Sequence, residues 1–283
     1  MTSPSSSRFI LIGLPATGKT SYLAALWYLV QHEQVAHKLM LDRLEGDNKY
    51  LNQISSAWLL CQPVPRTPTD SEKVVSMILK EVASGRTITV TFPDLSGESF
   101  SLQWTARQIT TGYDNFLKTA SGGVLFVSPE PHKPARIDAA APLVQEMNQA
   151  DVNGDAHMVE WEASLAPRQV QLVELLQFIA ARDYFKPPFR LALVISAWDK
   201  LKATGISPAK WFAKEVPLLF QFLESNRNLF EYTIYGVSAQ GGEYTTETEK
   251  LTEVDPSERI RVVSSDGRIS SHDLTEPLLW LMR

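Results

Sequence analysis

The sequence contains a single cysteine, Cys61, and no excess of basic side chains. One cysteine cannot form an internal disulfide, which excludes a disulfide-stabilised scaffold and any metal site built from several cysteines. Lysine and arginine together number 27 against 32 acidic residues, so the net charge is −5. Because nonspecific nucleic-acid binding requires a basic surface that neutralises phosphates, we expect no nucleic-acid partner.

Long apolar runs are also missing, although the hydrophobic content of 44% is that of an ordinary globular protein. No stretch approaches the roughly 20 apolar residues that a transmembrane helix requires. Residues 1–7 are rich in serine and proline and lack the apolar segment of a signal peptide, so we expect a disordered tail there. We therefore expect a cytoplasmic protein with one folded domain over residues 8–283.

Apolar segments with strand character alternate along the chain with segments of helical periodicity. This alternation is typical of a three-layer α/β fold, in which helices cover both faces of a mostly parallel sheet. A turn at 84–86 predicts one antiparallel hairpin. The expected strands are 9–12, 74–80, 87–92, 122–127, 189–196 and 230–237. The expected helices are 21–29, 47–60, 167–185, 207–226 with an interruption at Pro217, and 273–282.

Three segments interrupt this alternation and are expected to be insertions, near 38–62, 129–166 and 241–270. The first starts with a short extended piece at 38–41. The second contains several prolines and no clear periodicity, with at most one helix near 139–148. In the third, we expect a polar surface loop at 243–255 and a small hairpin over 261–269. Long irregular connections of this kind are usually functional or disordered.

The segment from Gly13 to Thr20 matches the phosphate-binding pattern GxxxxGK[ST] at every fixed position. An apolar strand precedes it and a helical segment follows it, which directs backbone N–H groups and a helix N-terminus at phosphate oxygens. The alternative is a chance match to the pattern, but a chance match would not be expected to have both a strand before it and a helix after it. Lys19 is expected to contact the β- and γ-phosphates, and the Thr20 hydroxyl to hold Mg²⁺. The other nucleotide contacts expected in this loop are Gly13, Pro15, Ala16, Thr17, Gly18 and Ser21.

A second motif of the form DxxG, Asp94-Leu95-Ser96-Gly97, follows the strand 87–92. An aspartate at the tip of a strand beside a phosphate loop can hold Mg²⁺ through water, and the Gly97 N–H can bond the γ-phosphate. Loss of that bond on hydrolysis would release the segment that follows. The alternative is a simple turn, because aspartate and glycine are common after strands.

The proline-rich loop at 61–69 holds two threonines, Thr67 and Thr69, either of which is a candidate for sensing the γ-phosphate and Mg²⁺. The neighbouring Arg66 is a candidate for stabilising transition-state charge in cis. The alternative for Arg66 is an exposed side chain in a polar loop.

A further carboxylate, Asp199, closes the strand 189–196 in the sequence Ser196-Ala197-Trp198-Asp199. A carboxylate there can accept hydrogen bonds from the N–H groups of guanine, a pattern that adenine cannot supply. The alternative is that Asp199 caps a helix that follows the strand.

These motifs, in this order over residues 9–240, resemble those of the P-loop GTPases of the translation-factor and Ras-like class. Four sequence segments resemble those of the bacterial double-GTPase branch of GTPase-associated conflict systems, namely GLPATGKTSYLAALW, PRTPT, FPDLSGE and SAWDK. The resemblance implies a Ras-like fold, GTP or GDP with Mg²⁺ as ligands, and a switch that works with a protein partner, either an effector or a second GTPase. It also implies defence as one setting for that switch.

The resemblance assigns further residues to the nucleotide base. Ser196 and Ala197 stand where these GTPases have asparagine and lysine, so the lysine stem that covers the base is missing. Trp198 or Lys200 is a candidate to replace it. Ser238-Ala239 resembles the loop whose backbone N–H meets guanine O6.

Glu98 stands where Ras-like proteins have the glutamine that orients the attacking water. A carboxylate can accept a hydrogen bond from water, but its charge repels a triphosphate, so we expect slow intrinsic hydrolysis or hydrolysis that needs a partner. Phe100 and Trp104 follow, either as residues that a partner contacts or as helix core. Two other functions remain open, an ATP-using enzyme on the same loop and a nucleotide-binding assembly protein with negligible hydrolysis.

Overall fold

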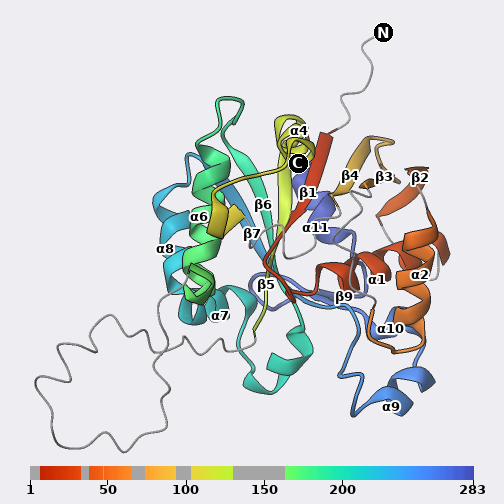
Figure 1. The fold of residues 1–283 in the computed structure, drawn as a ribbon. Helices are drawn as coiled ribbons and strands as arrows, with labels where there is room; N and C mark the ends of the chain where they lie inside the picture. Colours follow the sequence, from red (N-terminus) through yellow and green to blue (C-terminus); the bar gives the residue numbers. More distant parts are fainter. Residues whose placement is uncertain (1–6, 33–37, 47, 65–73, 94–102, 130–162) are drawn as a thin grey trace, which may run out of the picture.

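The computed structural model describes residues 7–32, 38–46, 48–64, 74–93, 103–129 and 163–283. Its strands are β1 Ser7–Ile12, β2 Leu39–Glu45, β3 Val74–Glu81, β4 Thr87–Pro93, β5 Gly122–Val127, β6 Phe189–Ile195, β7 Phe230–Ser238, β8 Arg261–Val263 and β9 Ser270–Ser271. They form one sheet in the order β2-β3-β4-β1-β5-β6-β7-β8-β9. Helices lie on both sides of this sheet (Figure 1).

The helices of the described residues fall into two groups, one on each face of the sheet. The first group contains α1 Lys19–His32, α2 Asn48–Leu59 and α11 Glu276–Leu281, which share one core cluster with the sheet. The second contains α4 Thr111–Thr119, α6 Arg168–Ala180, α7 Pro208–Glu215 and α8 Pro217–Ser225, which share the other. The short helices α9 Thr248–Glu253 and α10 Pro256–Arg259 lead into β8. Among the described residues, no helix combines the length and apolar character needed to cross a membrane.

The centre of the sheet is parallel, since β4, β1, β5, β6 and β7 pair side by side in the same direction. This confirms the predicted α/β fold with a mostly parallel sheet. The antiparallel part is larger than the hairpin predicted at 84–86, because β2 pairs antiparallel to β3, and β8 pairs antiparallel to both β7 and β9. The small hairpin predicted over 261–269 is present as β8 and β9, whereas the pairings of β2 with β3 and of β7 with β8 join segments that no local turn signal connects.

Side chains along the central strands alternate between the two core clusters, as the pleat of a strand requires. On β1, Phe9 and Leu11 face α1 and α2, whereas Ile10 and Ile12 face the α4 and α6 side. Helix α1 is buried over nine consecutive residues, from Tyr22 to Val30. Such a helix is hydrophobic all round because it is covered on several sides.

Several helices differ from their predicted bounds. Helix α4 was not predicted, since only Tyr113 and Leu117 of its residues are buried and the periodic signal is short. The segment 243–255, predicted to be a loop, contains α9, and α6 ends at Ala180, well before residue 185. The predicted interruption at Pro217 is confirmed, because α7 ends at Glu215 and Pro217 starts α8. The helix predicted near 139–148 lies outside the described residues.

Candidate nucleotide-binding site

The loop between β1 and α1 adopts the backbone that a phosphate cradle requires. Ala16 and Gly18 have positive φ angles of 58° and 84°, in the region that favours glycine. At Gly13, an added Cβ would lie 2.9 Å from Thr17 Oγ1 and 3.0 Å from the Cβ of Phe126 on β5. The buried hydroxyl of Thr17 donates a hydrogen bond to Leu14 O at 2.8 Å. The loop is therefore closely packed.

The side chain of Lys19 lies back across this loop. Its ammonium Nζ donates to Gly13 O at 2.6 Å and to Leu14 O at 2.7 Å. Burial lowers the pKa of Lys19 from its ordinary value of 10.5 to about 7. A phosphate oxygen at the mouth of the loop would stabilise the charged form of this desolvated side chain. Thr20 and Ser21 follow, half-buried, in the first turn of α1.

The carboxyl end of β6 lies directly beside the phosphate loop. An added Cβ at Gly18 would lie 3.0 Å from the Cβ of Ser196, the residue after β6. Ala197 then adopts a left-handed conformation with φ 46°, and a 3₁₀ helix begins at Trp198. Ligands of open parallel sheets bind at this edge, where the strands end.

The structure brings Asp199 and Ser238 together, although 39 positions separate them. The buried hydroxyl of Ser238 donates to Asp199 Oδ1 at 2.5 Å and accepts from the Gly241 N–H at 3.0 Å. The carboxylate is thereby held at the end of β6, beside the loop that follows β7. Ala239 is half-buried in that loop. The structure thus brings together the two residues predicted to contact the base.

Trp198 does not cover a base, which settles one of the two alternatives for the missing lysine stem. Its side chain is buried, and an added Cβ at Gly236 would lie 2.3 Å from Trp198 Cδ2. The indole therefore packs on the β7 backbone, and only glycine at position 236 allows this contact. Lys200 is exposed and remains a candidate for covering the base.

The other predicted site residues, Arg66, Thr67, Thr69, Asp94, Gly97, Glu98 and Phe100, lie outside the described residues. Within the described ranges, no group of three or more histidine, cysteine, aspartate or glutamate side chains could hold a metal ion. Thr20 is the predicted Mg²⁺ ligand that the structure places, at the start of α1 beside Lys19.

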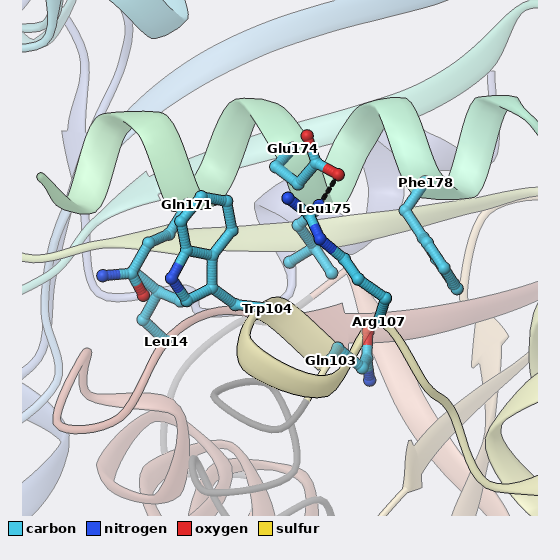
Figure 2. Close-up of a pocket in the computed structure, with 8 residues that line it drawn as sticks. All are labelled: Leu14, Gln103, Trp104, Arg107, Gln171, Glu174, Leu175 and Phe178. Carbon is cyan, nitrogen blue, oxygen red and sulfur yellow. Dashed lines mark ion pairs between the residues drawn. The ribbon is translucent and has the colours of Figure 1, made fainter. Parts of the chain in front are cut away.

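The described segment that follows the DxxG motif is anchored on α6 (Figure 2). Residues 103–106 form one helical turn, and the half-buried Trp104 donates from Nε1 to Ala163 O. Arg107 forms an ion pair with Glu174 of α6, and its Cζ lies 4.9 Å from the centroid of the Trp104 ring. Trp104 is thus held against its own protein by these contacts, while part of its side chain stays exposed.

A small pocket separates this segment from α6, and its lining includes Leu14 of the phosphate loop. Gln103 also lines it and is buried, and its Oε1 has no hydrogen-bond partner among the described residues. The phosphate loop, the segment after DxxG and α6 therefore meet around one cavity (Figure 2).

Sequence reasoning missed three side chains beside the loop that follows β7, namely Trp58, Gln240 and Tyr244. Trp58 Nε1 donates to Ala239 O at 2.9 Å. The Tyr244 hydroxyl hydrogen-bonds Ser21 at the start of α1 and lies 3.4 Å from Gln240 Oε1. Trp58 lies in the helical stripe of α2, which predicted only a core position, so no local signal pointed to these contacts.

Comparison with known proteins gave one family and a set of solved structures. The model of the family described as Double-GTPase 1 matches residues 10–281. No curated protein sequence matches. The G domain of the T. maritima FeoB iron transporter is 12% identical, with 88% of this chain and 97% of that chain covered and a TM-score of 0.34.

Two further solved structures are similar at comparable scores. The putative nucleolar GTP-binding protein 1 of Plasmodium falciparum is 10% identical, with 89% of this chain and 88% of that chain covered and a TM-score of 0.36. The GTPase-like domain of S. cerevisiae Ski7, bound to GTP, is 13% identical, with 85% of this chain and 44% of that chain covered and a TM-score of 0.39.

Proposed function

The chain belongs to the Double-GTPase 1 family, whose model spans residues 10–281, and on that premise we propose that it is a Mg²⁺-dependent molecular switch that binds and slowly hydrolyses GTP. One observation carries the guanine assignment. Asp199 is fixed by Ser238 at the end of β6, which adjoins the phosphate loop at Gly18. A held carboxylate at that edge accepts from the two N–H positions of guanine, whereas adenine offers no such pair.

The phosphate end of the nucleotide is assigned to the loop from Gly13 to Thr20. The backbone N–H groups of the loop and of the first turn of α1 would bind phosphate oxygens, aided by the helix dipole. Lys19 would exchange its two carbonyl partners for β- and γ-phosphate oxygens, which neutralises the charge that develops in phosphoryl transfer. The Thr20 hydroxyl would hold Mg²⁺.

The roles proposed for the remaining catalytic residues rest on sequence alone. We assign Mg²⁺ and γ-phosphate contacts to Asp94, Gly97 and Thr67 or Thr69, and stabilisation of transition-state charge to Arg66. Glu98 in place of a water-orienting glutamine supports a low intrinsic rate. Because a slow GTPase needs another protein to accelerate hydrolysis or to respond to the bound nucleotide, we propose a protein partner. Bacterial conflict systems are one proposed biological role.

A competition assay tests the nucleotide assignment against the ATP-using alternative. The purified protein with Mg²⁺ is titrated with GTP and ATP, and we expect GTP to bind at least about a hundredfold more tightly, since two charge-assisted hydrogen bonds distinguish the bases. Equal affinity would support the ATP-using enzyme. Steady-state phosphate release then separates a slow GTPase, which turns over GTP, from an assembly protein, which does not.

The lowered pKa of Lys19 predicts that nucleotide affinity depends on pH. In the free protein its pKa is about 7, and a bound triphosphate would raise it, so binding above pH 7 takes up a proton. Affinity for GTP should therefore fall as pH rises from about 7 to 9, by up to about tenfold per pH unit.

Calorimetry at pH 8 in buffers of different ionisation enthalpy measures this proton directly. We expect uptake approaching one proton per GTP. At this pH the γ-phosphate is already ionised, so the proton would bind to Lys19. Affinity that stays flat between pH 7 and 9, with no proton taken up, would show that Lys19 is charged before binding.

A further inference from the structure

The loop that follows β7 is held from outside the nucleotide site by the end of α2. Trp58 Nε1 donates to Ala239 O at 2.9 Å, and the amide nitrogen of Gln240 lies 3.4 Å from Trp58 O and 3.3 Å from Cys61 Sγ. Trp58, Cys61 and Gln240 are all buried. The loop is thus fixed by α2 on one side, while Ser238 fixes the Gly241 N–H on the other.

Gln240 also connects this loop to the phosphate loop. Its Oε1 accepts from the Tyr244 hydroxyl at 3.4 Å, and that hydroxyl also hydrogen-bonds Ser21, two residues after Lys19. Burial raises the pKa of Tyr244, so the hydroxyl stays protonated and able to donate at neutral pH. A continuous polar chain therefore runs from α2 through Gln240 to the first turn of α1.

The buried Arg259 side chain also contacts the end of α2. The Arg259 side chain, at the end of α10, donates from Nη1 to Leu59 O at 3.1 Å and to Cys61 Sγ at 3.1 Å. The Arg259 backbone is also close to the loop, because an added Cβ at Gly241 would lie 2.7 Å from Arg259 O. Figure 1 shows α10 beside the lower end of α2. Removing the Arg259 side chain would take away this donor from both Leu59 O and Cys61 Sγ.

We propose that Trp58 and Gln240 are positioning residues that hold the Ser238–Ala239 loop in the geometry that meets guanine O6, so that the α2 insertion sets the rate of nucleotide release. The proposal rests on the proposed function. Neither side chain needs to touch the nucleotide. Each fixes the backbone around Ala239, and preorganised donors lose less entropy when a ligand binds.

The test replaces Trp58 with phenylalanine, which keeps an aromatic ring and removes the N–H donor. Release of N-methylanthraniloyl-GDP is followed by stopped-flow fluorescence, and affinities are measured for GTP and for 2-aminopurine riboside triphosphate, which lacks O6 and the hydrogen on N1. We expect W58F to release GDP about five- to tenfold faster and to lose a similar factor in GTP affinity, the usual effect of one buried hydrogen bond. Affinity for the analogue without O6 should not change.

Trp27→Phe is a matched control, because Trp27 is buried between α1 and α2 and its Nε1 donates to Asn52 Oδ1 at 2.9 Å, away from the loop. W27F should release GDP at the wild-type rate. Gln240→Met, nearly isosteric, gives a second route to the same result if W58F does not fold. Unchanged release in W58F and Q240M, or equal losses for both nucleotides, would overturn the proposal. A wild-type protein that does not prefer GTP over the analogue would instead count against base reading itself.

Discussion

Replacing Lys19 with alanine should reduce the affinity for GTP at least about a hundredfold, as measured by calorimetry with Mg²⁺ present. The ammonium already lies at the mouth of the phosphate loop, where it donates to Gly13 O and Leu14 O. Hydrogen bonds from a cation to phosphate are each worth about 1.5–3 kcal/mol, and Lys19 would make two of them.

The fold itself should tolerate this change. Burial lowers the pKa of Lys19, which means that the charged form is disfavoured in the free protein, so removing the charge does not cost stability on that account. Lys210→Ala, at an exposed position on α7, is the control and should bind GTP as the wild type does. An affinity within threefold of the wild type in K19A, with an unchanged melting temperature, would contradict the assigned phosphate site.

Replacing Asp199 with asparagine should reverse the base preference from guanine to xanthine. The carboxylate accepts from N1–H and N2–H of guanine, whereas an amide can accept from N1–H and donate to O2 of xanthine. Ser238 Oγ donates to Asp199 Oδ1, and the same bond to an asparagine Oδ1 would turn the new NH₂ group toward the base. We expect GTP affinity to fall about a hundredfold and XTP affinity to rise above it.

Asp183→Asn provides the comparison, because Asp183 is exposed in the turn that follows α6 and lies outside the proposed site. Competition between GTP, XTP and ATP for a fluorescent nucleotide measures all three preferences in one experiment. If D199N keeps the wild-type order of preference, Asp199 is only part of the first turn of the 3₁₀ helix after β6, and the guanine assignment loses its main support.

Local patterns predicted the parts of the molecule in which neighbouring residues determine the structure. The strand before Gly13, the helix that starts at Lys19 and the break at Pro217 depend on periodicity and on proline geometry, which a sequence displays directly. The parallel centre of the sheet followed from the alternation of strands and helices. The order of motifs placed Asp199 and Ser238 after neighbouring strands, and their contact follows from that order.

The features that could not be predicted depend on packing between distant segments. Helix α4 buries only Tyr113 and Leu117, too few positions for a periodic signal. The hydrogen bond between Trp58 and Ala239 joins residues 181 positions apart. Trp58 lies in the insertion near 38–62, which contains no sequence motif that would predict this contact. The sequence made Trp198 a candidate for covering a base, because its packing against the backbone of Gly236 depends on a contact between β7 and the segment after β6 that no local pattern reveals.

The cover of α1 bears on how this protein is made. The hydroxyl of Tyr22 donates to Leu274 O at 2.7 Å, and Leu274 and Leu278 complete the core cluster that encloses α1. The helix that carries Lys19 is synthesised more than 200 residues before Leu274 and Leu278, which form part of its apolar cover. A chain that has not yet reached residue 278 therefore lacks part of the apolar surface that covers α1.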